Sequence, residues 1–115
     1  QRIGSPSVGD VVRQGDVYLE CLDDGYEGQT EILDRQLAPG TTQGSRHILE
    51  GDCTIWKENP IQESTVSGFL VGPSFRCDSD VEVTHPEHGN KILPDGTAWG
   101  VLYQRVGAVE RRVRD

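Results

Sequence analysis

The sequence predicts an all-β fold, either a small and mostly antiparallel barrel or a two-sheet roll, with little helix. Only 34% of the 115 residues are hydrophobic, and 14 Gly and 6 Pro make the chain rich in turn formers. No window of about 11 residues has helical periodicity, whereas short alternating or apolar runs recur between turn residues. These observations favour about eight short strands around one modest core.

Each expected strand is an alternating or apolar run that Gly, Pro, Asn or Asp residues interrupt. The strands are expected near residues 11–22, 31–37, 47–50, 53–57, 68–77, 81–85, 90–93 and 98–106.

Two turns and one helix complete the predicted elements. Gly51-Asp52 separates two short strands and predicts a hairpin between residues 47–50 and 53–57. The segment 93–97, Leu-Pro-Asp-Gly-Thr, is expected to join two antiparallel strands, with Gly96 at positive φ. The one helix candidate is residues 109–114.

The charge of the chain is uneven along its length. We divide the chain into an N-terminal arm at residues 1–10, a β-domain at 11–106 and a charged tail at 107–115. The net charge is −8: residues 1–100 hold 7 Lys and Arg against 17 Asp and Glu, and residues 101–115 hold 4 against 2. An acidic body repels phosphate backbones, which disfavours general nucleic-acid binding.

No apolar run reaches the roughly 20 residues of a membrane span. The expected partner is protein, either copies of this chain or a larger assembly.

The three cysteines, Cys21, Cys53 and Cys77, are widely spaced and form no C-x-x-C pair. Each lies in an apolar stretch, which is typical of buried thiols and fits a reducing compartment. One disulfide plus one free thiol is the alternative. No signal-peptide core is visible, so the expected localisation is cytoplasmic or virion-associated.

The candidate site residues are the three histidines, His47, His85 and His88. His85 and His88 stand in a turn after a strand, and imidazole binds first-row metals well. If strand 47–50 lies beside strand 81–85, His47 completes a three-nitrogen site for one transition-metal ion. The alternative is a core His85 that is hydrogen-bonded to backbone, with His88 exposed on the turn.

No other segment carries a recognisable site. The sequence has no G-x-S-x-G elbow, no EF-hand calcium loop and no G-K-[ST] phosphate loop. We therefore expect no catalytic residues and no cofactor, a single metal ion being the alternative. The larger aromatic side chains are expected in the core: Tyr18, Trp56, Trp99 and Tyr103.

Three segments of the chain carry a recognisable motif pattern. Residues 12–17, V-R-Q-G-D-V, are similar to the motif R-Q-G-D-V. Residues 37–40 and 44–49 resemble the motif L-A-x-G-E-x-T-G-H-x-H-x-L, with Ser45 in place of its first His. Residues 85–88, 93–96 and 104–105 are similar to the motif H-x-E-H-x-P-x-x-L-P-x-G-x-Y-x-V-x-x-Q-R-E-Y. In this order, over about residues 12–105, the segments resemble a family of small uncharacterised bacterial and phage proteins.

Two functions follow as hypotheses. The first is a non-catalytic structural, assembly or interaction module, such as a subunit or decoration protein of a homomeric virion, filament or shell. The missing catalytic motifs, the Gly/Pro-rich arm and the opposite charges of body and tail favour it. The alternative is a cupin-like barrel that binds a metal or small ligand through its histidines, either as a binding protein or as an enzyme.

Overall fold

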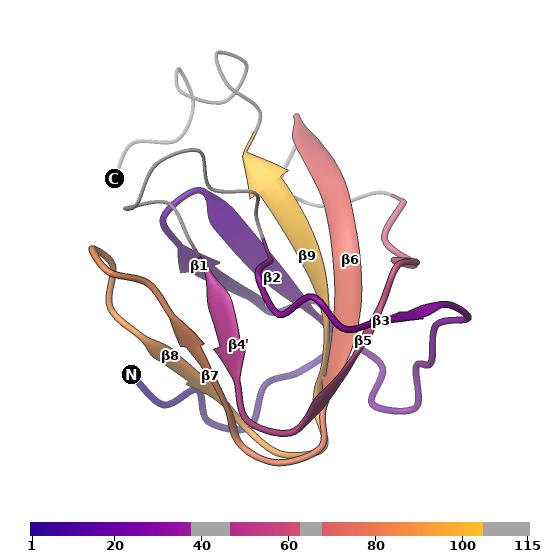
Figure 1. The fold of residues 1–115 in the computed structure, drawn as a ribbon, viewed down its shortest axis with the longest axis horizontal. Helices are drawn as coiled ribbons and strands as arrows, with labels where there is room; N and C mark the ends of the chain where they lie inside the picture. The colour runs from indigo at the N-terminus through magenta and orange to yellow at the C-terminus, as the bar shows by residue number, and fades with distance from the viewer. Residues whose placement is uncertain (38–46, 63–67, 105–115) are drawn as a thin grey trace.

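The computed structural model describes residues 1–37, 47–62 and 68–104, and in these residues the chain forms strands and no helix (Figure 1). Accordingly, none of the described segments is a helix that could cross a membrane. The strands are β1 (Val11–Gln14), β2 (Val17–Leu22), β3 (Glu31–Ile32), β4 (Ile48–Glu50), β5 (Cys53–Trp56), β6 (Phe69–Cys77), β7 (Val81–Thr84), β8 (Lys91–Leu93) and β9 (Ala98–Gln104).

The strands form two antiparallel sheets. The larger sheet has six strands in the order β1-β2-β9-β6-β5-β3, and the smaller has three in the order β4-β7-β8. The smaller sheet lies across part of the larger one (Figure 1). The all-β prediction is confirmed in its two-sheet form, and the sheets do not close into a barrel.

The core lies between the two sheets because alternate side chains of their strands point inward. Trp99, Phe75 and Leu19 of the larger sheet are fully buried, and they pack in one cluster with Val83 and Leu93 of the smaller sheet. A second, smaller apolar cluster includes Tyr18, Leu22, Ile61, Ala98 and Leu102. Tyr18, Trp56 and Trp99 are buried as expected, and Tyr103 is partly buried.

Residues 11–22 form a hairpin where one strand was predicted. β1 and β2 pair directly, with Val11 opposite Glu20, and the chain reverses at Gly15-Asp16. Gly15 has a φ of +61°, a left-handed conformation that glycine adopts without a Cβ clash. This reversal brings Asp16 to one end of the larger sheet.

The predicted hairpin around Gly51-Asp52 is wrong. β4 pairs with β7, with Ile48 opposite Thr84, whereas β5 pairs with β6 and β3. Gly51 and Asp52 therefore connect the smaller sheet to the larger one. A short link between strands has the same turn residues whether or not the strands pair, so the sequence did not separate the two cases.

Gly96 has the predicted positive φ, at +85°. β8 and β9 on either side of this turn belong to different sheets, however, so the turn is a connection between layers and not a hairpin. The strand predicted at 31–37 is shorter than expected, because β3 ends at Ile32. An isolated bridge from Gln36 to Ile48 follows it.

The N-terminal arm is bonded to the β-domain. The backbone N–H of Ile3 donates to the carbonyl of Ile92 in β8 at 2.9 Å, and the N–H of Gly9 donates to Cys21 in β2 at 2.9 Å. The arm therefore extends the smaller sheet of its own chain. The predicted tail at 107–115 and the helix candidate at 109–114 lie outside the described residues.

Candidate functional site

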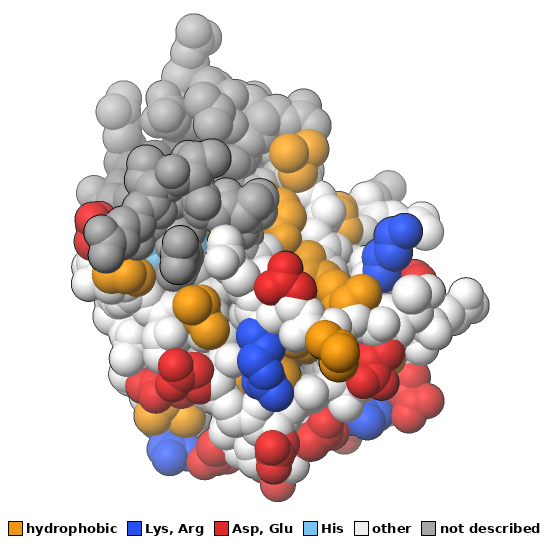
Figure 2. All heavy atoms as spheres, viewed as in Figure 1, with side chains coloured by type: hydrophobic (Ala, Val, Ile, Leu, Met, Phe, Trp, Pro, Cys, Tyr) orange, Lys and Arg blue, Asp and Glu red, His pale blue; other side chains and the backbone are white. Residues whose placement is uncertain are grey.

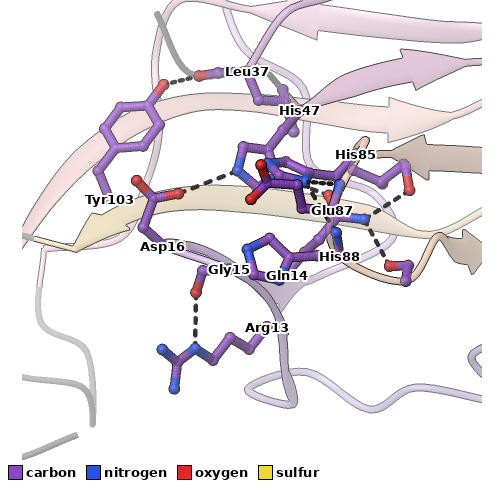
Figure 3. A network of polar contacts seen from close by, with 12 residues as sticks. Arg13, Gln14, Gly15, Asp16, Leu37, His47, His85, Glu87, His88 and Tyr103 are labelled. Carbon is purple, nitrogen blue, oxygen red and sulfur yellow. Dashed lines mark hydrogen bonds and ion pairs between the residues drawn. The ribbon is translucent and has the colours of Figure 1, made fainter. Parts of the chain in front are cut away.

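The three histidines lie side by side (Figure 3). Pairing of β4 with β7 places His47 next to His85, with ring centroids 4.4 Å apart, and His88 follows at 4.5 Å from His85. The strand arrangement on which the predicted site depended is therefore confirmed. We call His47, His85 and His88 the histidine cluster.

His47 is fully buried, and its orientation is set by Gln14 at the end of β1. The Gln14 amide nitrogen donates to the carbonyls of Val83 and Gly89, each at 2.9 Å. Its amide oxygen then faces Nδ1 of His47 at 2.8 Å. Because an amide oxygen only accepts, Nδ1 must carry a hydrogen, and Nε2 of the neutral ring carries a lone pair.

That lone pair points to a carboxylate. Nε2 of His47 lies 3.2 Å from Oδ1 of Asp16, whose side chain is 66% exposed. Burial lowers the pKa of His47, with the hydrogen bond to Asp16 opposing this effect. In the neutral ring, two acceptor atoms thus face each other, and this pair attracts a proton, a hydrogen-bond donor or a cation.

His85 has the opposite tautomer. Its Nδ1 accepts hydrogen bonds from the backbone N–H groups of Glu87 and His88, at 3.0 and 3.1 Å. The hydrogen of the neutral ring is therefore on Nε2, which acts as a donor. Burial and the nearby charge of His88 lower the pKa of His85. The expected core histidine with backbone hydrogen bonds is confirmed.

His88 is exposed on its turn, as expected, and its ring lies against Gly15 (Figure 3). A Cβ at residue 15 would lie 2.8 Å from Nε2 of His88 and 3.5 Å from Cε1 of His47. The absence of a side chain at Gly15 thus lets the two rings approach the same turn that carries Asp16. Three groups meet there: His47, which directly precedes β4, Asp16 of the β1–β2 turn and His88 of the β7–β8 turn.

The polar groups of the site are unequal as metal ligands. Within residues 1–37, 47–62 and 68–104, no three His, Cys, Asp or Glu side chains already surround a common point in the way that bound metal requires. His47 and Asp16 present free electron pairs to each other, and His88 is next to them, whereas His85 presents an N–H. Coordination of one ion by all three histidines stays a prediction.

Sequence reasoning missed Gln14 and Asp16 as site residues. Both belong to the V-R-Q-G-D-V segment at residues 12–17, which carried the family resemblance. This shared segment was the one available signal. The hairpin turn within it, which brings Gln14 and Asp16 to the histidines, was not predicted.

Comparison with known proteins gives a family and no activity. The profile of a family described as a domain of unknown function (DUF8820) matches residues 13–104, which include every residue of the site. No curated protein and no solved structure matches the chain. The match covers most of the sequence and agrees with the resemblance to an uncharacterised family. The chain belongs to the DUF8820 family.

Proposed function

We propose that this domain is a binding module in which His47, Asp16 and His88 bind a divalent first-row transition-metal ion. The observation that supports this is the pair formed by Nε2 of His47 and the Asp16 carboxylate at 3.2 Å. Gln14 fixes the imidazole so that its lone pair, and not its N–H, faces the carboxylate.

The spacing of the pair suits a metal ion. Imidazole nitrogen and carboxylate oxygen bind zinc at about 2.1 Å, so atoms 3.2 Å apart subtend about 100° at a shared ion. That angle lies close to both tetrahedral and octahedral geometry. Metal-bound histidines in proteins commonly donate their second ring N–H to an oxygen acceptor, and Gln14 provides that acceptor here.

The third ligand in this proposal is His88. Its ring is exposed and lies over Gly15, so Nε2 reaches the ion by side-chain rotation without a change in the strands. His85 has a different role, because its Nε2 carries a hydrogen. We assign it as a hydrogen-bond donor to a water or anion on the ion. This function requires no catalytic step.

The proposal is tested by titration with Zn²⁺ and Co²⁺. Protein purified without chelators is analysed for metal, stripped, and titrated by calorimetry at neutral pH. We expect about one ion per chain, with binding at least about tenfold weaker in Asp16→Asn and in His88→Gln.

The matched control is Asp24→Asn, which removes an exposed carboxylate in the loop after β2. It should bind as the wild type does. No binding by the wild type, or equal binding by Asp16→Asn, contradicts the proposal.

A second candidate function is the assembly or interaction module, and one surface favours it. A groove of about 460 Å³ lies beside β3, β6 and β9, and Val71 in its lining is exposed. Leu33 and Leu70, which adjoin lining residues in the sequence, are also exposed. Apolar side chains gather over the middle of this face in Figure 2. The groove is lined by Ile32, Asp34, Gln36, Leu37, Lys57, Val71, Gly72, Pro73 and Tyr103.

Exposed apolar surface of this kind is typical of interaction sites. We expect the chain to self-associate at high concentration, which light scattering at low and high salt measures. Val71→Ser, at an exposed residue in the groove lining, should weaken that association, and Val8→Ser, at an exposed site in the arm, should not. A wild-type chain that stays monomeric at both salt concentrations contradicts self-assembly.

A further inference from the structure

Two of the three cysteines lie directly opposite each other in the larger sheet. Cys53 of β5 and Cys77 of β6 are partners in the strand register. In the next pair along the two strands, Asp52 and Asp78, the N–H of Asp78 donates to the Asp52 carbonyl at 2.8 Å. The N–H of Cys77 points away from β5 and donates to the Thr97 carbonyl at 2.8 Å. Cys53 and Cys77 therefore form a non-hydrogen-bonded pair.

This pairing brings the two thiols within bonding reach. Residues in a non-hydrogen-bonded antiparallel pair have Cα atoms about 4.5 Å apart. Disulfides span Cα distances of about 4.4–6.8 Å, so the pair meets that requirement at its short end. Both side chains project from the same face of the sheet, because residues that are directly opposite share a face.

The two thiols differ in access and in charge environment. Cys77 is 1% exposed in the core cluster, whereas Cys53 is only partly buried at its edge. The Arg35 guanidinium lies 3.4 Å from Sγ of Cys53 and is held in place by the Gly51 carbonyl at 2.7 Å. A fixed cation beside the more accessible sulfur stabilises its thiolate.

We propose that Cys53 and Cys77 form a reversible disulfide when the protein meets a small-molecule disulfide such as oxidised glutathione. The Cys53 thiolate attacks one sulfur of that molecule, which breaks its S–S bond and releases one thiolate. The Cys77 thiolate then attacks Cys53 and releases the second. Overall, two protein thiols lose two protons and two electrons, and the small disulfide is reduced to two thiols.

Cys21 takes no part in this reaction. It is buried in β2 opposite Trp99 of β9, so its strand partner is not a cysteine. Burial raises the pKa of the Cys53 thiol, although the charge of Arg35 opposes the effect. Burial raises the pKa of Cys77 to about 12. Both shifts make thiolate scarce near neutrality, so oxidation should be faster at pH 8.5 than at pH 7.

The test is oxidation of the reduced, folded chain with excess oxidised glutathione at pH 8.5, followed by mass spectrometry and peptide mapping without reductant. We expect a loss of about 2 Da in the wild type, with Cys53 and Cys77 in one linked peptide, and reversal by dithiothreitol. Cys21→Ser should behave in the same way. Cys77→Ser should stop at a glutathione adduct on Cys53.

A second measurement monitors the first chemical step, the attack of Cys53 on oxidised glutathione. Arg35→Gln should slow modification of Cys53 several-fold, and thermal unfolding curves of the variant check that it is folded at the assay temperature. The proposal is overturned if the wild type accumulates only glutathione adducts, forms a disulfide through Cys21, or keeps all of its thiols free.

Discussion

Two parts of the same inter-sheet core are built on different principles. Around Trp99 and Phe75 the core is apolar, and its stability comes from burial and close packing. Around His47 and Gln14 it is polar, although both side chains are almost completely buried. Burying polar atoms is unfavourable unless each finds a partner. The polar part thus contributes less to stability per buried atom, and in exchange it fixes the orientation of specific atoms.

The largest effect is expected in the apolar part. Trp99→Ala removes the largest fully buried side chain and leaves a cavity between the sheets, which should reduce the free energy of unfolding by about 3–5 kcal/mol. Urea unfolding measures this difference. Val8→Ala, at a side chain that is 70% exposed, is the control and should change stability by less than about 0.5 kcal/mol. A loss below about 1 kcal/mol for Trp99→Ala would mean that the core is not packed around this ring.

A smaller loss is expected in the polar part. Gln14→Leu keeps a side chain of similar size but leaves the Val83 and Gly89 carbonyls and the His47 N–H without their partner. The expected destabilisation is roughly 1–3 kcal/mol, also measured in urea. Gln29→Leu, at an exposed position, should be close to neutral. If both substitutions were neutral, Gln14 would not be holding the histidine cluster in place.

Alanine substitutions at two glycines distinguish the effect of backbone strain from the effect of changed geometry at the site. Gly15 and Gly96 both have positive φ, so alanine at either should cost about 1–2 kcal/mol. A Cβ at Gly15 would press on the His88 ring at 2.7 Å, whereas a Cβ at Gly96 meets nothing within 4 Å. We expect Zn²⁺ binding to be lost in Gly15→Ala and kept in Gly96→Ala. Equal Zn²⁺ binding by the two variants would mean that the His88 ring is not part of the metal site.

Acidification should destabilise the polar part selectively. Burial lowers the pKa of His47 and His85 below the ordinary value of 6.5, so the unfolded chain binds their protons more readily than the folded one. Their contribution to stability is complete above about pH 6.5 and is lost as the pH falls below that value. Urea midpoints at pH 7.5 and 5.5 measure the difference.

His85→Asn is the informative variant for this pH effect. The asparagine oxygen can occupy the place of Nδ1 and accept the same two backbone N–H groups, but it does not titrate. The loss of stability between pH 7.5 and 5.5 should therefore be smaller in His85→Asn than in the wild type. An unchanged pH dependence would assign the effect to other groups.

Much of the fold followed from sequence because strand alternation and turn residues are local signals. They gave the all-β class, the approximate strand positions and the positive φ of Gly96. Pairing between strands is not local, so the Gly51-Asp52 link was mistaken for a hairpin although it connects two sheets. The reversal at Gly15 was missed because Gly15-Asp16 was taken as the start of the alternating run that continues to Leu22, and residues 11–14 show no alternation of their own.

The candidate site was partly predictable for the same reason. Histidines are rare enough to identify by type, and the proximity of His47 to His85 required only that β4 and β7 pair. The roles of the individual rings depend on hydrogen bonds from residues far away in sequence. Gln14 acts on His47 across 33 positions, and no periodicity or spacing rule relates them.

The proposed metal site depends on the fold holding His47 and His85 in opposite tautomers. Long-range ¹H–¹⁵N correlation spectra of the metal-free protein at neutral pH distinguish protonated from unprotonated ring nitrogens directly. We expect the hydrogen of His47 on Nδ1 and that of His85 on Nε2. Assignment of both rings to the same tautomer, or averaging of His47 between its two tautomers, would contradict the structural basis of the proposed site.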